Sequence, residues 1–209
     1  MPAFTGAGLT LVISPLIALM KDQLDGLPPP LRQQAVAINS SMDGDELRRA
    51  MTLMAARHYR LVYVAPERLR QQSFVHALRA AGLSRMVIDE AHCVSLWGHD
   101  FRPDFLHLAQ AHRDLGAPPL LAMTATAPPR VRVDIEQQLF APGTQVRVLA
   151  GDTFRPNLQL SAVRVRDDDE RIHALAALLA ELPGPGIVYA RSRQRCEELA
   201  EFLRSQGVD

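Results

Sequence analysis

The sequence predicts an α/β protein in which a parallel sheet is covered by helices on both faces. Short apolar runs alternate with longer amphipathic segments, which is the pattern of such a sheet. Hydrophobic residues make up 47% of the chain, as in globular proteins with a core. At 209 residues the chain is longer than most single domains, so we expect one complete and one partial domain.

Six apolar runs are the expected strands of the first domain. A helix is predicted between the second and the third of them, because Leu47, Ala50 and Met54 recur at helical spacing behind Asp43, the expected N-cap. Its apolar face, methionines included, is expected in the core. The six expected strands are 9–14, 35–39, 61–64, 86–89, 120–124 and 145–149.

A domain boundary is expected near residue 150. Gly143-Thr144 and the stretch 151–157 are rich in turn-forming residues. Beyond them we expect a strand at 158–165, a helix opened by the acidic run 167–170, and a strand at 187–190. The acids complement the helix dipole and do not indicate a metal site. The expected division is a first domain at 1–150, a junction at 151–165 and the beginning of a second domain at 166–209.

Composition limits the cellular context. Lysine plus arginine and aspartate plus glutamate each total 23, so the chain has no overall basic charge to attract nucleic acid, and such binding would require local basic clusters. Cys93 and Cys196 form no disulfide framework, which fits a reducing, cytoplasmic location. The apolar run 9–20 has no preceding basic residue, is interrupted by Pro15 and is too short to cross a bilayer. We therefore expect no membrane association.

A carboxylate pair, Asp89-Glu90, follows the apolar run 86–88. Ligands of parallel sheets bind beyond the carboxyl ends of strands. Hydrolysis of a nucleoside triphosphate needs a carboxylate that holds Mg²⁺, directly or through water, and a group that positions the attacking water. Asp89 suits the first role and Glu90 the second, while His92 can link the site to its neighbours through both ring nitrogens. The alternative is an acidic strand end that merely faces solvent.

A zinc site formed by His92, Cys93, His99 and Asp100 is a further alternative. The spacing of these residues matches neither a structural zinc finger nor a His-Glu-x-x-His helix. We therefore expect no zinc in this segment.

Two aromatic residues, Trp97 and Phe101, follow the carboxylates. They could be core residues, but the glycine, proline and charged residues around them are typical of a surface loop. Exposed aromatics beside a basic residue such as Arg102 suit stacking on unpaired bases. The loop is therefore a candidate binding surface for single-stranded nucleic acid.

The segment 89–105, which reads DEAHCVSLWGHDFRPDF, resembles motif II of RecQ-type DNA helicases and the aromatic-rich loop that follows it. Leu96 stands where that family usually has glutamine, and Asp152-Thr153-Phe154 replaces its usual Ser-Phe-Asp. Five other segments resemble, in the order of that family, motif Ia, the next DNA-contacting segment, motif III, the junction between the motor domains and motif IV. They are 12–23, 63–69, 122–127, 155–158 and 187–192.

The resemblance implies the RecA-like fold of P-loop NTPases, with most of the first motor domain and the beginning of the second. It implies an enzyme that uses ATP and Mg²⁺ to translocate 3′ to 5′ on single-stranded DNA and to unwind forked duplexes in DNA repair and recombination. Two alternatives stay open. The chain could be a catalytically inactive DNA-binding fragment, or part of a nucleic-acid-dependent translocase that does not unwind.

The resemblance also implies a role for individual residues. Asp89, Glu90 and His92 would be catalytic, and Thr124, Ala125 and Thr126 would couple the nucleotide site to DNA. Ser14 and the threonines could instead cap helices. The implied DNA-binding residues are Ser14, Pro15, Lys21, Pro66, Glu67, Arg68, Trp97, His99, Phe101, Arg102, Tyr189 and Ser192.

A phosphate-binding loop of the form G-x-x-x-x-G-K-[ST] does not occur in the sequence. Lys21 is the only lysine, and no lysine follows Gly6 and Gly8 closely enough to complete such a loop. We expect the chain to be the middle of a helicase, without the loop at one end or motifs V and VI at the other. Two consequences are expected for the isolated chain: no significant ATP hydrolysis, and aggregation through unpaired sheet edges.

Overall fold

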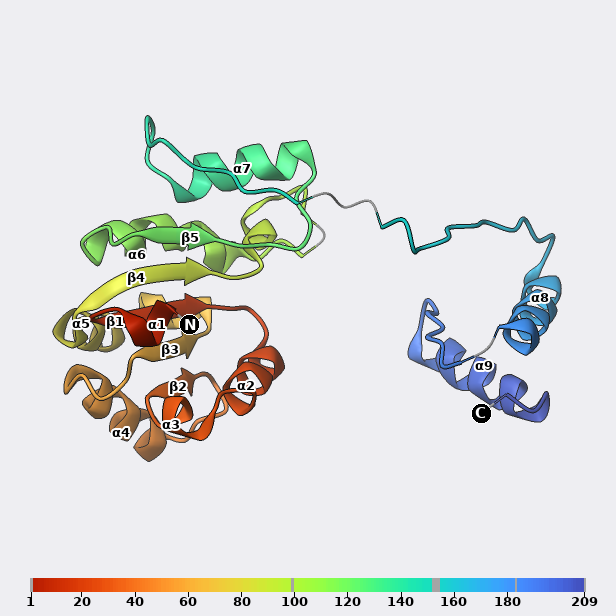
Figure 1. The fold of residues 1–209 in the computed structure, drawn as a ribbon, viewed down its shortest axis with the longest axis horizontal. Helices are drawn as coiled ribbons and strands as arrows, with labels where there is room; N and C mark the ends of the chain where they lie inside the picture. The colour runs from red at the N-terminus through yellow and green to blue at the C-terminus, as the bar shows by residue number, and fades with distance from the viewer. Residues whose placement is uncertain (1, 99, 152–154, 183, 209) are drawn as a thin grey trace. The chain divides into compact units, whose positions relative to one another are not determined.

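The computed structural model describes residues 2–98, 100–151, 155–182 and 184–208. The chain divides into two compact units, Met1–Leu149 and Ala150–Asp209 (Figure 1). Among the described residues, no helix is both long enough and apolar enough to cross a membrane.

A parallel sheet of five strands forms the centre of the first unit, which confirms the predicted α/β fold. Its order is β2-β3-β1-β4-β5, so sequential strands are joined by crossovers through helices. Four strands begin where the sequence predicts them, and β4 begins three residues before Met86. The strands are β1 (Leu9–Ile13), β2 (Ala35–Ile38), β3 (Leu61–Val64), β4 (Leu83–Ile88) and β5 (Leu120–Ala122).

The helix predicted behind Asp43 is confirmed as α4. The Asp43 carboxylate accepts hydrogen bonds from the Asp45 and Glu46 amides at 2.9 and 2.8 Å, and the Glu46 carboxylate accepts one from the Asp43 amide at 3.1 Å. This capping box satisfies amides that a helix start leaves without partners. The helices of the first unit are α1 (Pro2–Thr5), α2 (Ile17–Asp25), α3 (Pro29–Arg32), α4 (Gly44–Ala55), α5 (Gln72–Ala81), α6 (Leu108–Asp114) and α7 (Pro129–Leu139).

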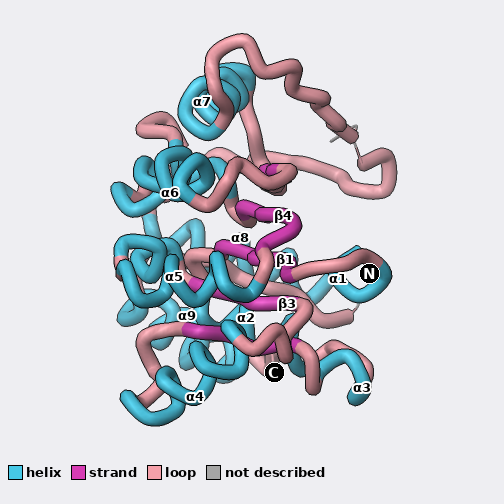
Figure 2. Tube along the Cα trace, turned by 90° about the vertical axis from the view of Figure 1, so that its left-hand side faces the viewer, coloured by secondary structure: helices cyan, strands magenta, loops and turns pink. Residues whose placement is uncertain are grey.

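Strand side chains alternate between two apolar clusters, one on each face of the sheet. From β3, Val62 and Val64 join the larger cluster, which includes residues of α4 to α7, whereas Leu61 and Tyr63 join the smaller cluster with residues of α1 and α2. Figure 2 shows α4, α5 and α6 on one side of the sheet and α1 and α3 on the other. Both faces are covered, as the sequence predicts.

The strand predicted at 145–149 is wrong, because this segment has no regular secondary structure. A strand is stable only when a neighbour satisfies its backbone hydrogen bonds. Among the described residues no strand pairs with this segment, so its apolar residues alone do not make it a strand.

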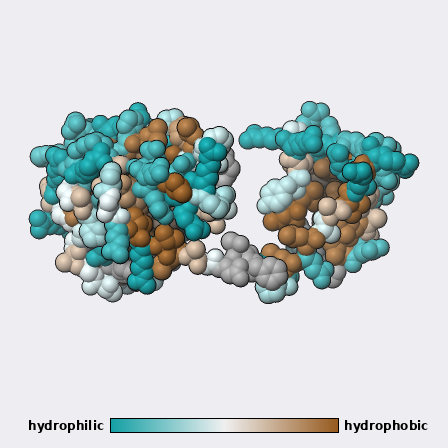
Figure 3. Space-filling view, turned by 90° about the horizontal axis from the view of Figure 1, so that it is seen from above, coloured by the Kyte–Doolittle hydropathy of each residue, from teal (hydrophilic) through white to brown (hydrophobic). Residues whose placement is uncertain are grey.

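The described residues of the second unit form two helices, α8 (Asp168–Glu181) and α9 (Arg193–Ser205). The predicted start of α8 is confirmed, since the Asp167 carboxylate accepts the Glu170 amide at 2.8 Å. The strands predicted at 158–165 and 187–190 are wrong for the same reason as 145–149, because neither has a partner strand in the described part of the chain. Apolar residues of these segments are exposed, and Figure 3 shows apolar side chains gathered on the second unit.

Candidate nucleotide and nucleic-acid site

The strands of the sheet end in one row, which brings distant segments together. Ile13 is in register with Val64 and with Ile88, and Ile88 is in register with Ala122. Backbone hydrogen bonds continue past the strand ends, from Asp89 N to Ile13 O and from Met123 N to Ile88 O, both at 2.8 Å. The segments that resemble motifs Ia, II and III therefore begin at the same carboxyl edge, where ligands of parallel sheets bind.

Asp89 and Glu90 form the turn at the end of β4, and both are partly exposed. Asp89 Oδ1 accepts the Glu90 amide at 3.0 Å, and its other carboxylate oxygen makes no hydrogen bond among the described residues. A Mg²⁺ ion that also binds nucleotide phosphates needs only one or two protein carboxylates, so Asp89 fits this role. Among the described side chains, no three from His, Cys, Asp and Glu cluster as metal ligands.

The backbone of Glu90 adopts the left-handed conformation, with φ of 50° and ψ of 44°. This region is uncommon for residues other than glycine and marks local strain. It turns the chain from β4 into the short 3₁₀ segment Ala91–Val94. As a result, Glu90 Oε2 lies 3.2 Å from Nδ1 of His92.

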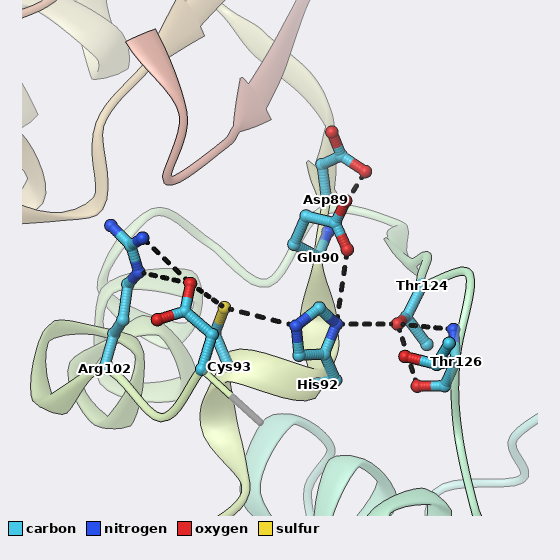
Figure 4. A network of polar contacts seen from close by, with 8 residues as sticks. Asp89, Glu90, His92, Cys93, Arg102, Thr124 and Thr126 are labelled. Atoms are coloured by element: carbon cyan, nitrogen blue, oxygen red, sulfur yellow. Dashed lines mark hydrogen bonds and ion pairs between the residues drawn. The ribbon is translucent and has the colours of Figure 1, made fainter. Parts of the chain in front are cut away.

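His92 is buried and joins Glu90 to the segment that follows β5 (Figure 4). Its Nδ1 atom lies 2.9 Å from Oγ1 of Thr124. The Thr124 hydroxyl donates its own proton to the Thr126 carbonyl oxygen at 3.1 Å, so its oxygen can only accept from the ring. Since the Glu90 carboxylate also accepts, this network assigns a proton to Nδ1 of His92. The predicted coupling residue Thr124 thus contacts the predicted catalytic residue His92.

The aromatic loop, described at residues 95–98 and 100–102, follows the same 3₁₀ segment. Trp97 is 61% exposed and is therefore not a core residue, whereas Phe101 is half-buried. A Cβ atom at Gly98 would lie 2.5 Å from the carbonyl oxygen of His92, so only glycine fits this close approach. The buried ring of Phe105 anchors the chain just beyond the loop.

The guanidinium of Arg102 holds the aromatic loop against the end of β1. It binds the Asp100 carboxylate at 2.8 and 3.1 Å and the Pro15 carbonyl oxygen at 3.2 Å. The hydrogen bonds that Arg102 donates to the Asp100 carboxylate raise the pKa of Arg102, so the side chain remains a cation. These contacts show that Arg102 orients the aromatic loop. The predicted role of Arg102 in binding DNA would be additional to this structural role.

Besides Arg102, three predicted DNA-binding residues of the first unit have structural contacts or are buried. The Ser14 hydroxyl is buried without a hydrogen-bond partner in the described structure, and Pro66 is also buried. Arg68 donates to the Asn39 carbonyl oxygen at 2.9 Å and to Gln71 Oε1 at 3.1 Å, and so ties two loops of the carboxyl edge together. By contrast, Lys21 and Glu67 are exposed.

Tyr189 and Ser192 belong to the second unit. Tyr189 is exposed, and the Ser192 hydroxyl caps α9 by accepting the Arg195 amide at 3.2 Å. His99, another predicted DNA-binding residue, lies outside the described residues.

Two residues of α7 contact the aromatic loop and are not indicated by any sequence motif. Arg130 lies over the Trp97 ring, with its Cζ atom 3.4 Å from the ring centroid. The Ser95 hydroxyl donates to Asp134 Oδ2 at 2.5 Å. Both contacts join segments far apart in sequence, so periodicity and motif spacing could not have found them.

Comparisons with known proteins identify the family of the chain and support its fold. The family model described as DEAD/DEAH box helicase matches residues 3–135. The chain belongs to this helicase family. Its fold is also that of two helicase structures: the DUF1998 helicase MrfA bound to DNA and AMPPNP, and the Mycobacterium smegmatis helicase Lhr bound to ssDNA and AMP-PNP. The TM-scores are 0.64 and 0.59 at 19% and 21% identity, over 95% and 98% of this chain and 29% of each helicase chain.

RecQ-family DNA helicases are among the relatives of this helicase chain. It is 38% identical to the probable ATP-dependent DNA helicase RecS of Bacillus subtilis, over 99% of the chain and 41% of RecS. It is also 38% identical to the ATP-dependent DNA helicase RecQ of Pasteurella multocida, over 99% of the chain and 32% of that protein. With mouse ATP-dependent DNA helicase Q5 the identity is 37%, over the whole chain and 23% of Q5. The chain thus spans less than half the length of these relatives.

Proposed function

We propose that this chain is the central part of the motor of a RecQ-like ATP-dependent DNA helicase, which moves 3′ to 5′ on single-stranded DNA and unwinds forked duplexes in repair and recombination. Residues 1–150 belong to its first motor domain, 151–165 to the junction and 166–209 to the beginning of its second. One observation carries the proposal: His92 contacts both Glu90 and Thr124, directly before an exposed aromatic loop.

In this proposal the carboxyl edge of the sheet is the hydrolytic site. Asp89 would hold Mg²⁺, through water or directly, and the bound ion would neutralise charge on the ATP phosphates. Glu90 would accept a hydrogen bond from the attacking water and orient it toward the phosphate. Its Oε2 atom lies 3.2 Å from Nδ1 of His92, so a shift of this carboxylate changes how the Nδ1 proton is shared with Thr124.

The aromatic loop is the proposed DNA sensor. Trp97 offers an exposed ring and Phe101 a half-exposed one, which suit stacking on unpaired bases. The structural neighbours MrfA and Lhr were determined with DNA and with ssDNA, and the RecQ relatives are named as DNA helicases. These similarities support single-stranded DNA as the ligand of this loop.

The chain by itself fits the alternative of a DNA-binding fragment without catalysis. Its 209 residues include no G-x-x-x-x-G-K-[ST] segment, and Lys21 is the only lysine. Without such a loop the phosphates are not positioned, and positioning supplies much of the rate of phosphoryl transfer. We therefore infer that the isolated polypeptide binds single-stranded DNA and does not hydrolyse ATP.

The test compares the isolated chain with a longer polypeptide that places a phosphate-binding loop ahead of it. The isolated chain should bind a short oligothymidylate without ATP turnover. In the longer protein, Glu90→Gln should retain binding of ATP and DNA and lose hydrolysis, whereas Trp97→Ala should lose only the stimulation by DNA. Turnover by the isolated chain that survives Glu90→Gln would contradict the proposal, and ATPase activity without strand separation on forked DNA would favour the non-unwinding translocase.

A further inference from the structure

One face of the Trp97 ring is covered by a cation. The guanidinium of Arg130, in the first turn of α7, lies over that face at 3.4 Å from the ring centroid. Even with this cover, Trp97 remains 61% exposed. Since an indole has two faces and one is occupied, much of the remaining exposure belongs to the ring edge and the opposite face.

A second contact fixes the backbone of the same loop to the same helix. The Ser95 hydroxyl donates to Asp134 Oδ2 at 2.5 Å and accepts the Trp97 amide at 3.1 Å. Arg130 and Asp134 are four residues apart and therefore lie on one face of α7. On this face, Arg130 contacts the indole ring, and Asp134 holds the Ser95 hydroxyl that accepts the Trp97 amide.

Two roles for Arg130 are physically possible. It could block the stacking surface until DNA displaces it, or it could hold the ring while a base stacks on the other face. If Arg130 blocked the stacking surface, the Trp97 ring would be buried. Trp97 is instead largely exposed, which argues against blocking. A cation over one face also restrains an exposed ring without closing the other face.

We propose that Arg130 is a positioning residue for base stacking, which holds the Trp97 ring with its opposite face open to an unpaired base. The inference rests on the proposed function and adds to it a residue of α7 as part of the DNA site. Helix α7 follows Thr124, whose hydroxyl contacts His92. The helix that positions the Trp97 ring therefore follows, in the chain, the segment whose Thr124 contacts His92.

The test uses the isolated 209-residue chain, in which Trp97 is the only tryptophan and so reports its own ring. Arg130→Gln removes the cation, and Arg132→Gln is the matched control, because an exposed arginine two positions along the helix points away from Arg130. Time-resolved fluorescence anisotropy measures ring motion. Titration with oligothymidylate, and with an abasic oligomer of equal length, separates base stacking from phosphate contacts.

We expect Arg130→Gln to increase fast motion of the Trp97 ring and to weaken oligothymidylate binding about two- to fivefold relative to Arg132→Gln. Binding of the abasic oligomer should fall equally in both variants. Unchanged or tighter oligothymidylate binding by Arg130→Gln would overturn the inference on Arg130 alone. If the wild-type chain binds both oligomers equally, Trp97 does not stack on bases, and the proposed DNA site fails together with the role of Arg130.

Discussion

The Nδ1 atom of His92 lies 2.9 Å from Oγ1 of Thr124, and this contact joins the ends of two neighbouring strands. His92 follows β4 and Thr124 follows β5, and the backbone of the two segments is also joined by the hydrogen bond from Ala91 N to Met123 O. Because His92 is buried, its ring nitrogen depends on protein partners. A displacement of either segment therefore alters the surroundings of Glu90, the other group that contacts Nδ1.

Thr124→Val should destabilise the first unit by about 1 kcal/mol, because it removes one acceptor from a buried donor while keeping the side-chain shape. Glu90 still accepts from the ring, which limits the loss. Urea unfolding followed by circular dichroism measures the change. Thr124→Ser keeps the hydroxyl and should retain most of the stability. Equal unfolding midpoints for Thr124→Val and wild type would mean that the contact contributes nothing.

Trp97→Ala and Phe105→Ala should have opposite effects on binding and stability. Phe105 is fully buried, so its truncation should cost about 3–5 kcal/mol of unfolding free energy. Trp97 is exposed, so its truncation should cost less than about 1 kcal/mol and weaken oligothymidylate binding. Urea titrations and a binding assay on the same samples check both. A large loss of stability without a loss of binding in Trp97→Ala would make Trp97 a packing residue.

The sequence predicts those elements that depend on residues close together in the chain. The capped start of α4 depends on Asp43 and Glu46, which are three residues apart. The strands of the sheet are apolar and pair with neighbouring strands. Three other apolar segments have no partner strand among the described residues: 145–149, 158–165 and 187–190. Pairing is a tertiary property, and apolar composition alone does not determine it.

The same distinction applies to the candidate site. Asp89, Glu90 and Trp97 lie within one short segment, so their spacing was informative. Arg130 and Asp134 reach the aromatic loop only because α7 packs beside the 3₁₀ segment Ala91–Val94. Arg68 and Ser192 look like ligand-binding residues in the sequence, yet their polar groups also hold a loop and cap a helix.

The two cysteines should differ strongly in reactivity. Burial, reinforced by the nearby Asp100 carboxylate, raises the pKa of the Cys93 thiol to about 11. At pH 8 about one Cys93 thiol in a thousand is then ionised, and only the thiolate reacts quickly. Cys196 is exposed. Iodoacetamide followed by mass spectrometry should therefore modify Cys196 well before Cys93.

The pH dependence of this reaction separates ionisation from access. A raised pKa keeps Cys93 neutral until the pH approaches about 11, so its labelling should rise steeply above pH 9 if ionisation limits it. Labelling of Cys93 at the rate of Cys196 at pH 8 would show that the segment Ala91–Val94 opens readily.

The outer edge of β5 should drive self-association of the isolated chain. β5 is the last strand in the sheet order, and no strand pairs with its outer edge in the described structure. Leu121 on this strand is 51% exposed. An open, apolar strand edge is a template for pairing with another chain, and a lysine on such an edge opposes that pairing. Leu121→Lys should therefore reduce association and change the unfolding free energy by less than about 1 kcal/mol.

The matched control is Leu106→Lys, which makes the same substitution at a 45% exposed leucine in a 3₁₀ turn instead of a strand. Size-exclusion chromatography with light scattering, over a range of protein concentrations, gives the mass of each variant. We expect Leu121→Lys to remain monomeric at concentrations where wild type and Leu106→Lys associate. If both lysine variants reduce association equally, general surface hydrophobicity is the cause and the edge of β5 has no special role. A wild-type chain that stays monomeric throughout would show that the open edge is tolerated.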